Sequence, residues 1–313
     1  MPNGLEPIAV EEVTSRLLPL QLYMVGCATE EEMNANVTAT IKRGYVPITD
    51  HLDKYKGRLS IVGSGPSLKK TYKDLSGDIM AINHSLKFLL KKKIVPKWAM
   101  IWDAAEICAE FAIPHPDITY LIGARCHPKV FERLKDCKVI VWHAGGDHNI
   151  AEFLSERDMK EPMVNGGSAG VTRAMYLGVA LGYRSLHMYG GDSCYHKNKT
   201  HVNGSLVNEK DMMVSIGNDP PQFFRTTPEW CSQINEFRDI YSIFSHPDIR
   251  IDMEVHGDGM LGYMYELMKG KDEKGLLWLE DGTPHESNVP TEVYEGEVPD
   301  QLLEESNYGT ITS

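Results

Sequence analysis

Glycine-rich and polar residues stand directly after several short apolar runs of this sequence. The first group follows the apolar run 59–62 and consists of Gly63, Ser64, Gly65, Pro66 and Ser67. Its two glycines let a ligand approach the backbone, so that bare N–H groups can face phosphate oxygens. The group lacks the third glycine of the dinucleotide fingerprint and the Lys-Ser/Thr pair of a P-loop. It predicts a nucleotide-binding turn of another kind, with a tight turn that binds nothing as the alternative.

Further polar residues follow later apolar runs in the same way. The Asn83 amide can reach a base or a ribose, and the Asp103 carboxylate can meet a ribose hydroxyl or serve only as a helix cap. An anion site is expected where Gly166, Gly167 and Ser168 open an apolar helix, because free N–H groups and the helix dipole favour negative charge there. These residues extend the predicted nucleotide site.

Candidates for the chemical step come from one later segment. Asp192 follows a Gly-Gly pair, and Lys199 and His201 lie in the polar stretch beyond it. A loop histidine over a nucleotide can act as a general base, and a lysine can stabilise a departing phosphate. His201 is the preferred base. Four other histidines stay open as alternatives, of which the first is the nearest: His196, His84, His143 and His148.

The elements that must position these residues alternate between strands and helices. This alternation predicts an α/β fold, a Rossmann-like and mostly parallel sheet flanked by helices. Strands are expected at 59–62, 79–82, 98–102, 120–122, 139–142, 185–189 and 249–255, and helices at 30–43, 85–93, 128–134, 171–181 and 228–244. Ligands of such sheets bind beyond the carboxyl ends of the strands, where the candidate residues fall.

Three parts are expected along the chain. Residues 1–57 form a helical leader, in which Thr29 and Glu32 predict a capping box. Residues 58–270 form the Rossmann-like nucleotide-binding transferase domain, with a polar, loop-like stretch at 202–221, and residues 271–313 form an acidic, partly disordered and flexible tail. The leader is interpreted as a packing or oligomerisation element, so a homo-oligomer is one expectation.

Composition narrows the class of protein. The formal net charge of -12 argues against an extended nucleic-acid-binding surface. The sequence has no apolar run of about 20 residues, the length that a membrane span needs. Glu6, Glu11 and Glu12 stand where a secretion signal would carry basic residues. The six cysteines include no CxxC pair, which favours reduced thiols in a cytoplasmic protein over a zinc site, and no metal ligands are assigned.

Taken in order, these motifs resemble those of the flagellar motility accessory factors, which share a domain family with archaeal 6-hydroxymethylpterin diphosphokinases. Residues 62–68 resemble the family's glycine-proline-serine-leucine signature, and residues 199–201 resemble a lysine-threonine-histidine segment of the motility factors. The first turn and Asn83 are also similar to those of bacterial sialyltransferases that use a cytidine-monophosphate sugar donor. The resemblance covers residues 58–205 and implies that residues 63–67 and Asn83 hold a nucleotide, with His201 as the base.

This resemblance favours a nucleotide-dependent transferase. The first hypothesis is a glycosyltransferase that moves a sugar, such as a nonulosonic acid, from a nucleotide-sugar donor to a hydroxyl acceptor without a further cofactor. The alternative is a pyrophosphokinase that uses Mg and ATP on a pterin-like alcohol, in which Asp103 and Asp192 would hold the metal between the phosphates. That branch typically carries two closely spaced aspartates after its third strand, whereas Asp103 is followed by Ala104, Ala105 and Glu106. A non-catalytic nucleotide-binding protein on the same scaffold is the third hypothesis.

Overall fold

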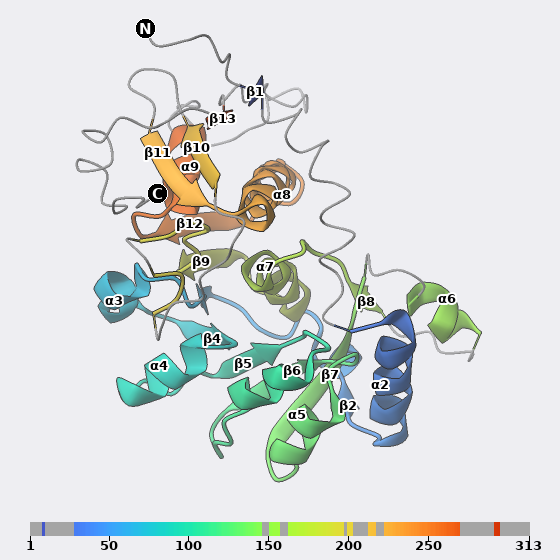
Figure 1. Cartoon of the computed structure of the whole chain (residues 1–313). Helices are drawn as coiled ribbons and strands as arrows, with labels where there is room; N and C mark the ends of the chain where they lie inside the picture. The colour runs from blue at the N-terminus through green and yellow to red at the C-terminus, as the bar shows by residue number, and fades with distance from the viewer. Residues whose placement is uncertain are drawn as a thin grey trace, which may run out of the picture. The chain divides into compact units, whose positions relative to one another are not determined.

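The chain forms two compact units in a computed structural model (Figure 1). The structure describes residues 8–9, 28–145, 150–156, 162–196, 199–202, 212–216, 222–269 and 291–294. The parallel-sheet unit comprises residues 25–64 and 72–189, and the antiparallel unit comprises residues 1–24, 65–71 and 190–313. Among the described helices, none has both the length and the apolar character that crossing a membrane requires.

The parallel-sheet unit is built on strands that each run parallel to their neighbours. Their order is β9-β3-β4-β5-β6-β7-β2, and β8 pairs with β7. The strands are β2 (Val46–Pro47), β3 (Arg58–Val62), β4 (Asp78–Ile82), β5 (Trp98–Ile101), β6 (Thr119–Gly123), β7 (Lys138–Ala144), β8 (Met163–Val164) and β9 (Ser185–Tyr189). The expected α/β fold with a mostly parallel sheet is therefore confirmed. Strands buried on both faces read as continuous apolar runs, which is why most of them could be located in the sequence.

Helices lie on both faces of this sheet. They are α2 (Glu30–Lys42), α4 (Ser85–Lys91), α5 (Pro128–Arg133), α6 (Ile150–Ser155) and α7 (Gly170–Leu181), with short 3-10 helices η1 (Ile48–His51), η2 (Tyr72–Asp74) and η3 (Glu106–Phe111). Figure 1 shows α7 on one face and α4 and α5 on the other. A Cβ on Gly178 of α7 would lie 2.7 Å from a Leu59 methyl group, so the glycine lets α7 pack closely on β3.

Helix α2 begins with the expected capping box. The Glu32 N–H donates to Thr29 Oγ1 at 3.2 Å, and the Thr29 N–H donates to Glu32 Oε2 at 2.7 Å. Further along the helix, Asn36 Nδ2 donates to the Arg125 carbonyl at 3.1 Å. This bond joins α2 to the segment that follows β6.

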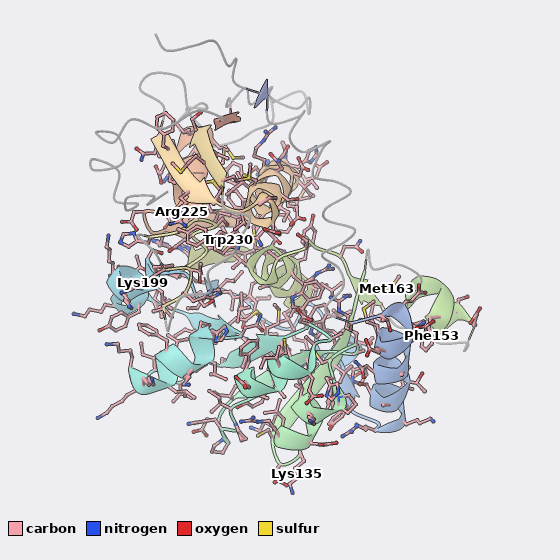
Figure 2. All side chains as sticks on the ribbon, in the orientation of Figure 1. Lys135, Phe153, Met163, Lys199, Arg225 and Trp230 are labelled. Atoms are coloured by element: carbon pink, nitrogen blue, oxygen red, sulfur yellow. The ribbon has the colours of Figure 1, made fainter. Side chains whose placement is uncertain are left out.

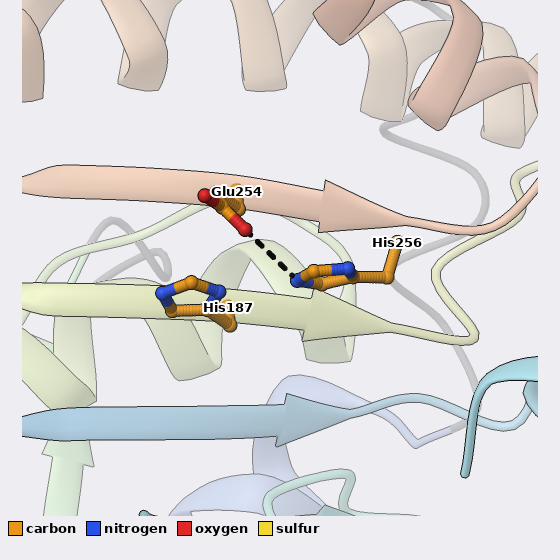
Figure 3. A group of neighbouring side chains, drawn as sticks. All are labelled: His187, Glu254 and His256. Carbon is orange, nitrogen blue, oxygen red and sulfur yellow. Dashed lines mark ion pairs between the residues drawn. The ribbon is translucent and has the colours of Figure 1, made fainter. Parts of the chain in front are cut away.

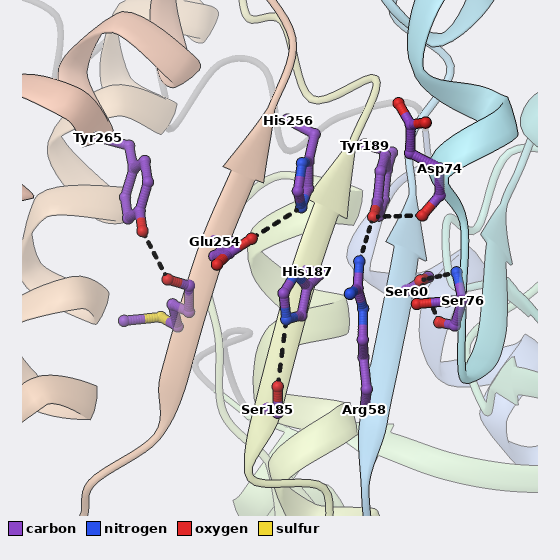
Figure 4. Close-up of polar contacts among 11 residues, drawn as sticks. Arg58, Ser60, Asp74, Ser76, Ser185, His187, Tyr189, Glu254, His256 and Tyr265 are labelled. Carbon is purple, nitrogen blue, oxygen red and sulfur yellow. Dashed lines mark hydrogen bonds and ion pairs between the residues drawn. The ribbon is translucent and has the colours of Figure 1, made fainter.

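The side chains of the sheet's own residues tie neighbouring strands together. Arg58 Nη2 donates to the Tyr189 hydroxyl, which donates in turn to the Asp74 carbonyl at 3.1 Å (Figure 4). Ser60 Oγ donates to the Ser76 carbonyl at 2.7 Å. These bonds fix β3 between β9 and the segment that leads into β4.

The antiparallel unit contains a sheet in the order β1-β13-β10-β11, in which every pairing is antiparallel. Its elements are β1 (Ile8–Ala9), α3 (Leu68–Thr71), β10 (Met212–Ile216), β11 (Gln222–Thr226), α8 (Pro228–Ser245), β12 (Asp252–His256), α9 (Met260–Lys269) and β13 (Thr291–Tyr294). Figure 2 shows Arg225 on β11 and Trp230 on α8. In β12, His256 Nε2 lies 3.4 Å from Glu254 Oε2 in an ion pair (Figure 3).

Two segments that were expected to lack regular structure contain a strand each. The stretch 202–221 is not a loop throughout, because β10 occupies residues 212–216 within it and pairs with β11. The polar residues on either side of this short apolar run concealed the strand. Within the expected tail, residues 291–294 form β13, and the rest of the tail lies outside the described residues, as does most of the leader's first half.

Candidate functional site

The predicted nucleotide turn leaves β3 as expected. The Gly63 N–H donates to the Tyr189 carbonyl at 2.7 Å, which continues the β3–β9 pairing by one residue. Ser64 is half-buried, whereas Ser67 is almost completely buried. Gly63 and Ser64 belong to the parallel-sheet unit, and Gly65, Pro66 and Ser67 belong to the antiparallel unit. The structure therefore divides the turn into a part on β3 and a part that the antiparallel unit holds.

Asn83 occupies the carboxyl end of β4 in an unusual backbone conformation. Its φ of 48° lies in the left-handed region, which asparagine tolerates better than most residues and which is frequent at functional sites. Its Oδ1 atom is buried and has no hydrogen-bond partner among the described residues. A buried oxygen without a donor costs free energy, so this atom is suited to accept a hydrogen bond from a ligand.

Asp103 follows β5 and is half-buried. Its Oδ1 accepts a hydrogen bond from the Ala105 N–H at 3.0 Å, which shapes the entry to η3. This bond closes an Asx turn ahead of η3, whose N-cap residue is Ala105 and has no side-chain cap. Since β3, β4 and β5 are adjacent, the strand ends before Gly63, Asn83 and Asp103 lie along one edge of the sheet.

Two arginines near this edge were not recognised from the sequence. The guanidinium groups of Arg125 and Arg173 lie over the Trp102 ring, 4.2 Å and 4.7 Å from its centroid. Arg125 Nε donates to the Trp102 carbonyl at 3.1 Å, and buried Arg173 donates to the Gly145 carbonyl at 2.7 Å. Arg125 follows the glycine that ends β6, and Arg173 follows the glycines at the start of α7. These positions after glycines were the feature of the sequence that could have identified them. The two arginines place two positive charges over Trp102, the residue that precedes Asp103.

The second glycine group precedes α7 as expected. The N-cap residue Ala169 has no side chain that could accept a hydrogen bond, so the first N–H groups of α7 are left to other acceptors. Gly166 has a φ of 153°, and a Cβ there would lie 3.0 Å from the Arg173 side chain. Ser168 is exposed and Gly167 is half-buried. This helix start has the backbone chemistry of an anion site.

Asp192 lies deep in the antiparallel unit. Its Oδ2 accepts the Ser67 N–H at 2.8 Å, and its Oδ1 accepts the Ser67 hydroxyl. Burial raises the pKa of Asp192 to about 6, against the opposing effect of these two bonds. Both carboxylate oxygens are thus used by one residue of the predicted nucleotide turn.

A neighbouring ion pair was also missed in the sequence. Lys70 of α3 lies 2.6 Å from Asp258, which stands between two glycines directly after β12. Burial opposes ionisation of Asp258, but the hydrogen bond and the charge of Lys70 outweigh it and hold the pKa of Asp258 below its usual value. A Gly-Asp-Gly group after a strand is the same signal that identified Asp192.

The loop candidates for the chemical step lie further along the antiparallel unit. His196 and Lys199 face each other across a short antiparallel bridge, with backbone N–O distances of 3.0 and 3.1 Å. Half-buried His201 lies 2.8 Å from the Thr200 hydroxyl through Nδ1, and Lys199 is exposed. The preferred base and its nearest competitor thus come from one short segment.

The other histidines have different surroundings. His143 is buried in β7, and the His84 ring packs edge-on against Phe111 with 4.2 Å between centroids. Burial lowers the pKa of His84 below its usual value. His148 lies outside the described residues.

The described residues form a parallel α/β protein whose sheet carries three features at its carboxyl edge. These are a glycine turn, an amide oxygen with no partner among the described residues, and a helix start without a side-chain cap. Residues 34–198 match the model of a family described as 6-hydroxymethylpterin diphosphokinase MptE-like. The match spans more than half of the 313 residues, and the chain belongs to this MptE-like family. A comparison with curated protein sequences found no match.

Two solved structures are similar to the chain. One is a Maf glycosyltransferase from Magnetospirillum magneticum AMB-1, with a TM-score of 0.52 and 15% identity over 67% of this chain. The chain spans about a third of that protein's length, since the match covers 34% of it. The other is a mammalian sialyltransferase, with a TM-score of 0.36 and 10% identity over 82% of this chain and 88% of that one. The first similarity shows a shared fold with a glycosyltransferase.

Proposed function

We propose that the chain is a nucleotide-dependent transferase, specifically a glycosyltransferase that moves a sugar from a nucleotide-sugar donor to a hydroxyl acceptor. Nucleotide binding is supported chiefly by Asn83, which follows β4 next to β3 and its glycine turn. The Oδ1 atom of Asn83 is buried and has no partner among the described residues. A ribose hydroxyl or a base N–H would satisfy this oxygen. The similarity to a Maf glycosyltransferase supports the choice of reaction.

The parallel-sheet unit supplies the groups proposed to hold the donor. We propose that the Ser64 N–H faces the ligand, because the Gly63 N–H is already bonded to the Tyr189 carbonyl, and that the start of α7 with residues 166–168 takes the phosphate charge. The cations of Arg125 and Arg173 raise the local potential in the same sense.

The chemical step is proposed as a direct displacement. His201 removes the proton of the acceptor hydroxyl, whose oxygen forms the new bond to the anomeric carbon. The bond from that carbon to the phosphate oxygen breaks, and its electron pair leaves with the nucleotide. Lys199 is proposed to stabilise the charge that develops on this phosphate. The step needs no further cofactor.

The family match also supports a second candidate function, the Mg- and ATP-dependent transfer of pyrophosphate to a pterin-like alcohol. Magnesium at such a site is bound by carboxylate oxygens together with the substrate phosphates. Both carboxylate oxygens of Asp192 already accept hydrogen bonds from Ser67, which favours the glycosyltransferase.

The test is a thermal-shift screen of purified protein against cytidine, uridine, guanosine and adenosine mono-, di- and triphosphates, each with magnesium and with a chelator. A ligand that binds only the folded state raises the melting temperature. We expect a cytidine or uridine nucleotide to stabilise the protein without magnesium. Stabilisation by ATP only with magnesium would favour the pyrophosphokinase. No shift with any nucleotide would contradict nucleotide binding in both.

Asn83→Ala makes the same test specific to one atom. We expect this variant to bind the stabilising nucleotide roughly tenfold more weakly, the cost of about one hydrogen bond to a buried acceptor. Asn34→Ala on α2 is the matched control and should bind like the wild type. Equal affinity of Asn83→Ala and the wild type, measured by isothermal titration calorimetry, would remove Asn83 from the site.

A further inference from the structure

Several segments that are distant in sequence meet around the Asp192 side chain. The first contains Ser67, which donates its N–H and its hydroxyl to the two carboxylate oxygens. The Gly65 N–H donates to the Gly190 carbonyl at 2.7 Å, so the same two segments are joined through their backbones as well. The Leu261 N–H of α9 lies 3.3 Å from the Asp192 carbonyl oxygen. A single buried carboxylate therefore stands at the junction of the nucleotide turn, the segment after β9 and the start of α9.

Three glycines leave room for this junction. A Cβ on Gly65 would lie 2.6 Å from Asp192 Cγ, and a Cβ on Gly259 would lie 2.7 Å from Asp192 Cβ. A Cβ on Gly257 would lie 2.5 Å from Ser67 Oγ. Real Cβ atoms do not approach other atoms so closely, so each glycine is required by the packing of the carboxylate against the turn. The contact between Asp192 and Ser67 thus restricts three positions of the sequence to glycine.

We propose that Asp192 is a positioning residue that holds the Gly65–Ser67 turn in its nucleotide-binding conformation, in place of the catalytic role expected from the sequence. The inference rests on the proposed nucleotide binding and deepens it. A group buried to this extent, with both oxygens bonded to the protein, is not exposed to a substrate. Its effect on a ligand acts through the position of Ser67 and through its charge beneath the turn.

Two other charged groups face this carboxylate. Lys70 approaches from α3, and Asp258 approaches from the segment between β12 and α9. Because Lys70 and Asp258 pair with each other, their charges largely cancel. His196 also acts on Asp258 through its charge, so the charge of Asp192 adds to a cluster of three titratable neighbours. Protonation leaves the contacts with Ser67 possible, since a neutral carboxyl group can accept the N–H and share its proton with the hydroxyl.

Amide hydrogen exchange tests the positioning role without reference to any ligand. In Asp192→Ala the Ser67 amide loses its acceptor, and we expect it to exchange roughly tenfold faster or more. In Asp192→Asn the side-chain oxygen still accepts this N–H, so exchange should stay slow. The Gly63 amide, which is bonded to Tyr189, is the internal control and should not change. An unchanged Ser67 rate in Asp192→Ala, with Gly63 also unchanged, would overturn the proposal.

If Asp192→Ala fails to fold, Ser67→Ala and Asp258→Asn decide the question. Ser67→Ala removes only the hydroxyl contact, and we expect severalfold weaker binding of cytidine monophosphate with a normal Gly63 amide. Asp258→Asn changes the exposed neighbouring carboxylate and should leave exchange at Ser67 as in the wild type. Normal cytidine monophosphate binding by Ser67→Ala would count against the proposal. If the wild type binds no nucleotide, the proposed function fails. The exchange rates then still test whether Asp192 holds the Ser67 N–H.

The pH dependence of cytidine monophosphate binding supplies a readout that loss of packing would not move. We compare the dissociation constants of the wild type and Asp192→Asn at pH 5.5 and pH 8, so that ionisation of the nucleotide and of the histidines cancels. The two proteins should bind similarly at pH 5.5. At pH 8 the wild-type carboxylate is ionised and adds a negative charge next to the turn that is proposed to bind the anionic nucleotide, so Asp192→Asn should bind severalfold more tightly. The same ratio at both pH values would contradict an effect of the Asp192 charge on binding.

Discussion

At the scale of single residues, the chain uses similar groups in opposite ways. Asp192 and Asp258 both follow glycines in the antiparallel unit, yet burial raises the pKa of Asp192 and the Lys70 ion pair lowers that of Asp258. Asp192 is almost completely buried and its contacts with Ser67 do not outweigh that burial, whereas Asp258 is exposed and lies beside a cation. Ser67 offers a neutral hydroxyl and an N–H, whereas Lys70 offers a full positive charge.

This difference predicts a pH dependence of stability with a definite sign. A carboxylate whose folded pKa is about 6, above its usual 3.8, binds more protons in the folded than in the unfolded state between these values. Its contribution to stability is complete below pH 4 and is lost as the pH rises through 6, by about 3 kcal/mol at most. Urea unfolding at pH 4.5 and pH 7 should show this loss in the wild type and not in Asp192→Asn.

Asp258 is the matched group of opposite sign. Its folded pKa is below the usual value, so its contribution is present at neutral pH and is lost as the pH falls through that pKa. The wild type should therefore lose more stability than Asp258→Asn on acidification below pH 4. If both aspartate variants changed the pH dependence of unfolding in the same direction, the two environments would not differ as the structure has them.

At the scale of elements, helix α2 connects the expected leader to the carboxyl edge of the parallel sheet. Its capping box fixes where it begins, and Asn36 then bonds the Arg125 carbonyl beside the Trp102 ring. Asn36 thereby helps to position Arg125, although 89 residues separate the two in the sequence. Helix α2 therefore contacts the segment after β6 in addition to preceding β3 in the chain.

The capping box gives a simple test at this scale. Thr29→Ala removes the acceptor of the Glu32 N–H and should lower the free energy of unfolding by about 1 kcal/mol. Thr29→Ser keeps the acceptor and should stay close to the wild type. Urea unfolding followed by circular dichroism measures both. Equal stability of the alanine and serine variants would mean that the end of α2 frays in solution and that its cap adds nothing.

The elements also show what the sequence could and could not predict. The apolar run at Leu59–Val62 was recognisable because a central parallel strand is buried on both faces. Two-residue strands such as β2 and β8 are too short for any periodicity to appear. The meeting of Arg125 and Arg173 at Trp102 depends on contacts between distant segments, and the burial of Asp192 depends on Ser67, 125 residues away. A glycine pair before an aspartate predicts a special backbone, and it does not say what the carboxylate contacts.

At the scale of the whole molecule, neither unit is one continuous piece of chain. The parallel-sheet unit is interrupted by residues 65–71, which belong with residues 190–313. Every described strand of the parallel-sheet unit nevertheless lies between residues 46 and 189. A fragment of residues 25–189 should therefore fold around β3 to β7 with reduced stability. In that fragment, amides of residues 65–71 should exchange fast, because Asp192 is missing, while those of β3 and β4 exchange slowly. Slow exchange at Ser67 in the fragment would show that the turn holds its conformation by itself.

The interruption at residues 65–71 also bears on how such proteins can be recombined. A chimera that took residues 190–269 from a relative would bring a foreign aspartate and foreign glycines to a native Ser67. Exchange of the segment 65–71 alone would create the reverse mismatch. Any viable crossover must therefore carry both stretches together, because they belong to one unit although 118 residues separate them in the sequence.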